Sequence, residues 1–188
     1  MADLIAIIRA YATHHRERTA TELRSFAEEP TIRAAISRAG LARRPDGKRY
    51  AHQSRIPERV LLEAQSRLLE SDIEECRSFV QLHGRISDLL SNIAGIGELT
   101  IYDTALRIGA RLNVEPQRIY LHRGTREGAR ALDLNWRAPW LSPNELPAEL
   151  QDLPPLEVED ILCIFKKELR QVTRTAPTSR TRGLGWVS

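Results

Sequence analysis

The chain has 188 residues, of which 41% are hydrophobic and 28% charged, and its formal net charge is +3. This length can bury a core, and the composition is typical of a globular protein rather than a disordered or fibrous one. It contains no apolar run as long as a membrane span, and its first residues lack the flanks of a signal peptide. We therefore expect a cytoplasmic protein with no membrane partner.

Apolar residues at helical spacing predict two helices in the first forty residues. The first covers residues 3–28. The second begins after Pro30, a residue that suits the first turn of a helix, and ends at Gly40.

A basic loop, residues 43–57, follows these helices and contains a Pro-Asp-Gly turn. Eight basic residues against two acidic ones lie between residues 31 and 59, and a second basic block spans residues 107–137. The side chains of the loop can donate to phosphate or to a base edge. The alternative is a solvated surface loop between helices.

Residues 57–83 predict either one long helix or two helices broken near Ser71, with Ser71 as the cap of the second. Cys76 and Cys163 are single, far apart and each within an apolar stretch. Buried free thiols are therefore expected rather than a disulfide or a metal site. No residue pattern predicts a metal or a cofactor.

The most informative element spans residues 86–112. Ile86, Leu90 and Ile93 share one face of a helix, and Gly95 can adopt the positive φ that ends it. A second helix begins at once, with Glu98 in its first turn. Because glycines carry no side chain, the amides at this second N-terminus can approach a phosphate closely.

The pattern Leu90-x-x-Ile93-x-Gly95-Ile96-Gly97-x-x-Thr100 resembles the helix-hairpin-helix motif of DNA repair and replication proteins. The resemblance implies contact with the DNA backbone, independent of sequence, through the hairpin amides and nearby basic side chains. The predicted nucleic-acid-binding residues are Gly95, Ile96, Gly97, Thr100, Arg107, Arg111, Lys48, Arg49, His52, Arg55, Arg123, Thr125 and Arg126. The alternative is a helical hairpin with a Gly-rich turn and no ligand.

Beyond the hairpin, residues 117–122 predict either a strand or a helical turn. The segment 123–132 carries two glycines, a hydroxyl and three arginines next to His122. It predicts either a second anion pocket or a helix capped at Gly124 and Thr125. The combined pattern from Gly95 to Thr125 also resembles bacterial protein sequences, a likeness that brings no activity with it.

The C-terminal third contains a Pro- and Trp-rich irregular segment near residues 136–155 and then an amphipathic helix over 156–172. Residues 173–188 predict a flexible C-terminal tail that either docks on a protein partner or is loose. The expected fold is all-α: a mainly helical single domain, residues 1–172, that contains the helix-hairpin-helix element 86–112.

Three functions fit the sequence, of which we expect the first, DNA binding without catalysis. The second is an enzyme similar to helix-hairpin-helix repair proteins. In one subset of these a lysine nucleophile lies in the hairpin region, where this chain has Glu98 and Leu99, and no lysine lies between Lys48 and Lys166. Asp103 or Asp133 would have to serve instead, and His52, His83 and His122 are possible general bases. The third function is that of a structural subunit of a bacterial assembly.

Overall fold

Nine α-helices and one two-stranded antiparallel ladder make up the computed structural model over residues 3–172, the part of the chain that it describes. The mainly helical class predicted from the sequence is confirmed. None of these helices combines the length and apolar character that a bilayer crossing requires. The predicted tail, residues 173–188, lies outside the described residues.

One core forms around α6 (Glu98–Leu112), which packs against α2 (Arg16–Ala27), α3 (Ile32–Gly40) and α5 (Phe79–Leu90), while α4 (Glu58–Leu69) packs on α3. Phe79, Leu82 and Ile108 are among its fully buried side chains. These are the residues whose helical spacing predicted a buried face. The N-terminus of α6 stays at the edge of this core.

A second core joins the two ends of the described chain. It contains side chains of α1 (Leu4–His14), α7 (Arg123–Ala131), α8 (Ala148–Gln151) and α9 (Pro155–Ile164). The ladder pairs β1 (Ile119–Tyr120) with β2 (Trp140–Leu141), and Tyr120 lies opposite Trp140. The stretch 117–122, for which a strand or a helical turn was expected, therefore contains a short strand.

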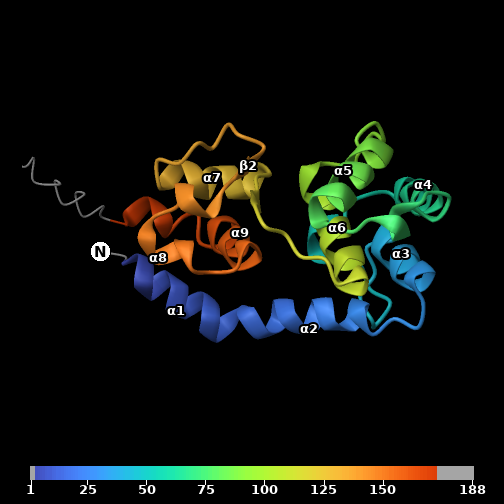
Figure 1. Cartoon of the computed structure of the whole chain (residues 1–188), viewed down its shortest axis with the longest axis horizontal. Coiled ribbons are helices and arrows are strands. Elements are labelled where there is room, and N and C mark those ends of the chain that lie inside the picture. The colour runs from blue at the N-terminus through green and yellow to red at the C-terminus, as the bar shows by residue number, and fades with distance from the viewer. Residues whose placement is uncertain (1–2, 173–188) are drawn as a thin grey trace, which may run out of the picture.

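Helices α1 and α2 run along one side of the molecule and connect the two cores (Figure 1). Tyr11 of α1 is buried in the second core, and Phe26 of α2 in the first. The single helix predicted over 3–28 is interrupted at His15, whose φ of −126° is not helical. The interruption lies between the segments that serve the two cores.

For the segment 57–83, the alternative of two helices broken near Ser71 is confirmed: α4 ends at Leu69, and α5 begins at Phe79 and continues to Leu90. The cap of α5 is Ser78 rather than Ser71, and the Ser78 side chain accepts a hydrogen bond from the Gln81 amide. Ser71 instead donates its hydroxyl to the Leu68 carbonyl, which closes the end of α4. The helix predicted over 156–172 ends at Ile164 and is followed by a single 3₁₀ turn.

Candidate functional site

The hairpin between α5 and α6 presents its backbone at the surface. Ile93 and Ile96 point into the first core, and Gly95 makes the reversal with a φ of +99°. Gly97 is the N-cap of α6 and provides no side-chain cap. The first hydrogen bond at the N-terminus of α6 runs from the Ile101 amide to the Gly97 carbonyl, so the amides before Ile101 have no intrahelical partner.

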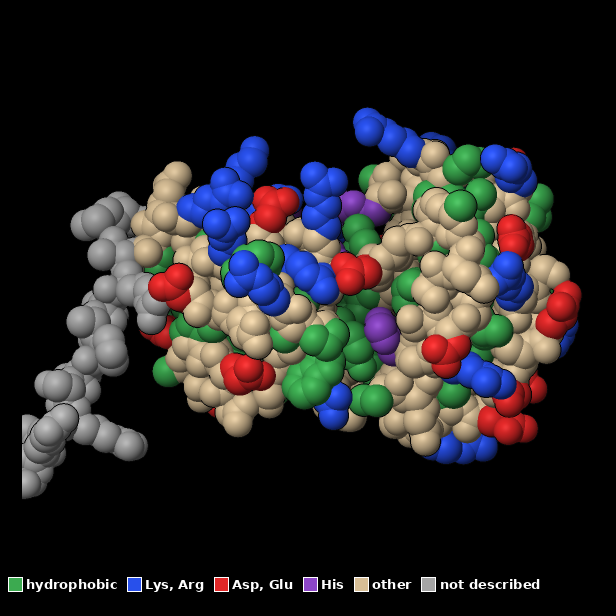
Figure 2. All heavy atoms as spheres, turned by 90° about the horizontal axis from the view of Figure 1, so that it is seen from above, with side chains coloured by type: hydrophobic (Ala, Val, Ile, Leu, Met, Phe, Trp, Pro, Cys, Tyr) green, Lys and Arg blue, Asp and Glu red, His purple; other side chains and the backbone are tan. Residues whose placement is uncertain are grey.

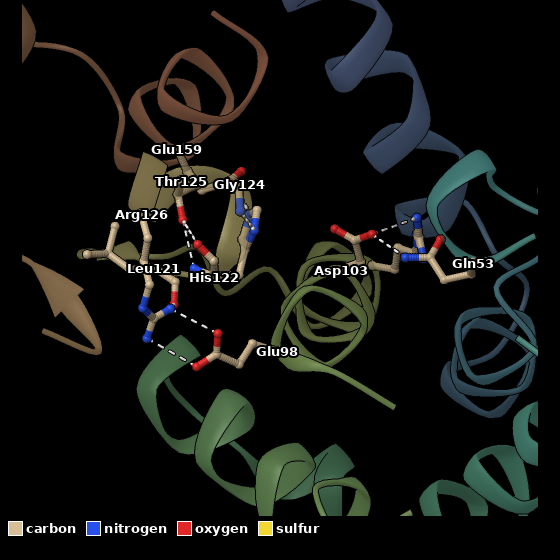
Figure 3. Close-up of polar contacts among 10 residues, drawn as sticks. Gln53, Glu98, Asp103, Leu121, His122, Gly124, Thr125, Arg126 and Glu159 are labelled. Atoms are coloured by element: carbon tan, nitrogen blue, oxygen red, sulfur yellow. Dashed lines mark hydrogen bonds and ion pairs between the residues drawn. The ribbon is translucent and has the colours of Figure 1, made fainter. Parts of the chain in front are cut away.

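The two carboxylates near this hairpin, Glu98 and Asp103, each bind another side chain. Glu98 forms a two-pronged ion pair with Arg126, with oxygen to nitrogen distances of 2.9 and 3.1 Å. Asp103 lies on another side of α6, where it accepts a hydrogen bond of 2.6 Å from Gln53 (Figure 3). Neither carboxylate therefore stands as an unpaired negative charge at the exposed glycines.

The structure buries four of the predicted contact residues, Ile96, Thr100, Arg107 and Thr125, and their side chains cannot reach an external phosphate. Arg107 is only 4% exposed; its guanidinium pairs with Glu22 at 3.0 Å and stacks on the Tyr50 ring. Thr100 and Thr125 are also buried. For Arg107 the prediction fails because α2 and the basic loop cover that face of α6. In the sequence, the i,i+4 spacing of Asp103 and Arg107 could have indicated that Arg107 pairs within the protein.

The basic loop lies next to the hairpin. It leads directly into the first turn of α4, and a Cβ placed on Gly95 would contact only Val60 of that turn, at 3.8 Å. Lys48, His52 and Arg55 of the loop are exposed, as predicted for side chains that contact a ligand. Arg49 instead donates to the Ile56 carbonyl and holds the end of the loop in place.

Two further arginines near the hairpin, Arg59 and Arg67, are not among the contact residues predicted from the sequence. Arg59 is exposed, next to Val60, and forms no ion pair with any described residue. Arg67 donates to the Leu89 carbonyl and the Asn92 side chain, so it ties α4 to the start of the hairpin. Helical spacing from Val60 could have placed Arg59 on the outer face of α4.

The remaining predicted cations lie apart from this group. Arg123 is exposed at the start of α7, and Arg111 donates to the Glu29 carbonyl at the far end of α6. Arg126 is paired with Glu98 as described. The structure therefore brings together the hairpin and the loop 43–57, but not the whole set of predicted contacts.

The segment 123–132 forms a helix, the alternative to a second anion pocket, but its cap is His122 rather than Gly124 or Thr125, which both lie within α7. His122 caps α7 by accepting a hydrogen bond from the Gly124 amide, and the Thr125 hydroxyl accepts one from the His122 amide. The Gly124 amide and the Thr125 hydroxyl are thus hydrogen-bonded within the helix terminus and are not available to an anion.

His122 and Glu159 form a buried pair with 2.6 Å between Nε2 and Oε1, and Cys163 lies beside them. Because Nδ1 of His122 accepts from Gly124, the ring proton is on Nε2 and points to the Glu159 oxygen. Burial lowers the pKa of His122 and raises that of Glu159. Burial also raises the pKa of Cys163 to about 12, so its thiol stays protonated.

This trio is the one group among the described residues with the donor types and spacing of a metal site. The tautomer fixed by the α7 cap does not suit such a role, because a ligating nitrogen must be free of its proton. With a protonated thiol and no free imidazole nitrogen next to it, the trio also lacks an activated nucleophile. Its role is structural: it joins α9 to the start of α7.

Two cavities lie between the two cores; His122 lines the first and Glu159 lines the second. The first, of about 380 Å³, is lined by residues of α5, α6, β1 and β2, and it includes Glu98 at its rim. The second, of about 260 Å³, lies among α2, α6 and α9 and contains Arg107 and Asp103. Seen from above, histidine and hydrophobic side chains line the furrow between the two halves of the molecule, with Lys and Arg side chains around it (Figure 2).

Comparison of the chain with protein-family models, curated proteins and solved structures finds no match.

Proposed function

We propose that this protein binds duplex DNA through its phosphate backbone, without sequence preference, at the hairpin 91–97 and the adjoining basic loop 43–57. The observation that supports this most is the pair of exposed glycines, Gly95 and Gly97, at the N-terminus of a helix of 15 residues. Free amides and the helix dipole favour an anion at such a position. Phosphate is the anion that a duplex presents in a regular array.

The charges around the hairpin support the same ligand. Glu98 is neutralised by Arg126, and the Asp103 carboxylate is 17% exposed and bonded to Gln53. Arg55 and Arg59 are exposed and form no ion pair with a described residue. Arg59 lies in the first turn of α4, the turn whose Val60 is next to Gly95, and Arg55 lies three residues before that helix, so both cations belong to the segment beside the hairpin.

Backbone binding of this kind has a defined salt dependence. With about three phosphates neutralised, a plot of log affinity against log salt concentration should have a slope of about −3. Fluorescence anisotropy with a labelled duplex measures it, and duplexes of unrelated sequence should bind alike. Arg55→Gln and Arg59→Gln should each reduce the slope by about one. The matched control is Arg9→Gln, at an exposed position of α1, and it should leave the slope unchanged.

Gly97→Asp tests the hairpin itself. The φ and ψ of Gly97, −113° and 173°, suit an Asp N-cap, and a Cβ placed there meets nothing within 4 Å. The variant should fold and gain a few tenths of a kcal/mol from the cap. It should nevertheless lose DNA affinity by about tenfold or more, because its carboxylate occupies the phosphate position.

Gly97→Asn separates charge from bulk in this experiment, since it has the same size and the same capping ability without the charge. We expect it to bind DNA more tightly than Gly97→Asp and less tightly than the wild type. Wild-type affinity in a folded Gly97→Asp protein would contradict the proposal.

A further inference from the structure

The first cavity has aromatic walls, and we call it the aromatic cavity. Its ring-bearing residues are His83, Tyr102, Tyr120, His122 and Trp140, and Arg118 lies among them. The ring centroids of Tyr120 and His83 are 4.2 Å apart, and those of Tyr120 and Tyr102 are 5.7 Å apart. Its volume of about 380 Å³ falls within the range of small-molecule sites, about 300–1,000 Å³.

The register of the β1 and β2 ladder places two aromatic side chains on one wall of this cavity. Tyr120 pairs with Trp140 across the β1 and β2 ladder, and residues directly opposite one another point to the same face of a sheet. Trp140 is half-buried, and the guanidinium carbon of Arg118 lies 4.0 Å above its ring. The cavity is therefore bounded by flat rings. Arg118 covers one face of Trp140 and His83 lies against Tyr120, so a planar ligand ring stacks on the faces that remain or takes the place of the guanidinium.

Two polar groups at the cavity have no partner among the described residues. Tyr102 is 2% exposed, and its hydroxyl makes no hydrogen bond. Buried hydroxyls are normally bonded, so a ligand that displaces the surrounding side chains and reaches this oxygen, which has no solvent-exposed surface in the free protein, would supply its missing hydrogen bond. Arg118 makes neither an ion pair nor a hydrogen bond and only stacks on Trp140. A ligand that satisfies both groups combines a planar polar ring with an anion.

The aromatic cavity also adjoins the hairpin. Glu98, the first residue of α6, stands at its rim, and Ile101 lines it one turn further along the same helix. The Glu98 carboxylate is held by Arg126, so it does not stand unpaired against an incoming phosphate. An unpaired nucleotide next to a phosphate held at the hairpin would thus lie at the mouth of the cavity.

We infer that the aromatic cavity binds a nucleotide, with the base stacked against Tyr120 and Trp140, an edge of the base bonded to Tyr102, and the phosphate facing Arg118. The nucleotide is either a free nucleoside monophosphate or an unpaired nucleotide of a strand. The second form rests on the proposed DNA binding, and the first does not.

Two titrations on the full chain test this inference. Isothermal titration calorimetry with AMP measures the free nucleotide, and anisotropy compares a duplex carrying a single-base bulge with the fully paired duplex. Stacking of one base should favour the bulged duplex by about tenfold. Trp140→Leu and Arg118→Gln should abolish AMP binding or the bulge preference, while the affinity for the paired duplex stays at the wild-type value.

The matched controls are Trp136→Leu and Arg137→Gln. Trp136 is also half-buried, and the guanidinium carbon of Arg137 lies 4.2 Å above its ring, but neither residue lines the cavity. Both controls should behave as the wild type, and circular dichroism confirms that all four variants are folded.

The outcomes separate the two proposals. AMP binding that depends on Trp140, without any duplex binding, supports the cavity and contradicts the DNA proposal. A bulge preference without AMP binding assigns the site to a nucleotide in a strand, and AMP binding without a bulge preference assigns it to the free nucleotide. If neither AMP binding nor a bulge preference is found, or if Trp136→Leu acts like Trp140→Leu, the inference is overturned, whatever the duplex affinity.

Discussion

Gly128→Ala is expected to lower the free energy of unfolding by about 3 kcal/mol or more, at the upper end of the cost of overpacking. A Cβ on Gly128 would lie 2.1 Å from the Leu162 carbonyl oxygen and 2.7 Å from its carbonyl carbon. These are backbone atoms of α9, so no side-chain rotation relieves the contact, and α7 and α9 must move apart. Because this pair of helices anchors the second core, the loss should be global.

Thermal unfolding measures this effect. A loss of about 3 kcal/mol lowers the midpoint by about 6–12 °C in a domain of this size. The control is Gly84→Ala in α5, where a Cβ meets nothing within 4 Å. Alanine is the better helix former by about 0.5–1 kcal/mol, so this control should raise the midpoint. Similar midpoints for the two variants would show that α7 and α9 are not in backbone contact.

Glu159→Gln should remove a loss of stability that Glu159 causes in the wild type as the pH rises above about 4.5. Burial raises the pKa of Glu159 well above 4.5, its ordinary value. Between those two pKa values the native state keeps a proton that the unfolded state has released, so the contribution of Glu159 to wild-type stability falls as the pH rises from about 4.5. Glutamine removes this loss and still offers an oxygen to the His122 N–H.

Denaturant unfolding at a series of pH values measures the difference between the variant and the wild type. That difference should grow in favour of Glu159→Gln as the pH rises above 4.5, until the folded pKa is reached. Because His122 Nε2 lies 2.6 Å from the Glu159 carboxyl, the two groups titrate as a pair, and the comparison reports the titration of that pair. Glu149→Gln, at an exposed position of α8, is the control. Parallel pH curves for the wild type and Glu159→Gln would refute a raised pKa for Glu159.

Local patterns were sufficient to predict the helices that bury an apolar stripe and the hairpin between α5 and α6. Gly95 has the predicted positive φ, although α5 ends at Leu90 rather than at Gly95, and Ile93 and Ile96 are buried. These features depend on residues close together in the chain. Periodicity could not place the break at His15, because that break follows from which core each helix serves.

Which residues form the candidate site was harder to predict, because it depends on contacts between residues far apart in the chain. Arg107 became an internal group because Glu22 and Tyr50, both distant in sequence, cover it. The aromatic cavity likewise depends on a ladder that brings Trp140 opposite Tyr120, and nothing local in either segment indicates that pairing. Charge counts along the chain identified the basic loop, but only the contact of Gly95 with Val60 placed it beside the hairpin.

The most direct test of DNA binding at the hairpin is the shift of backbone amide resonances in a two-dimensional NMR spectrum of the labelled protein as a short duplex is added. The largest shifts should occur at the amides of Gly97, Glu98 and Leu99, with smaller ones at Arg55 and Arg59 and none in α8. Adding salt should reverse all of them together. If the duplex binds and the hairpin amides stay unshifted, or if the duplex does not bind at low salt, the proposed function is contradicted.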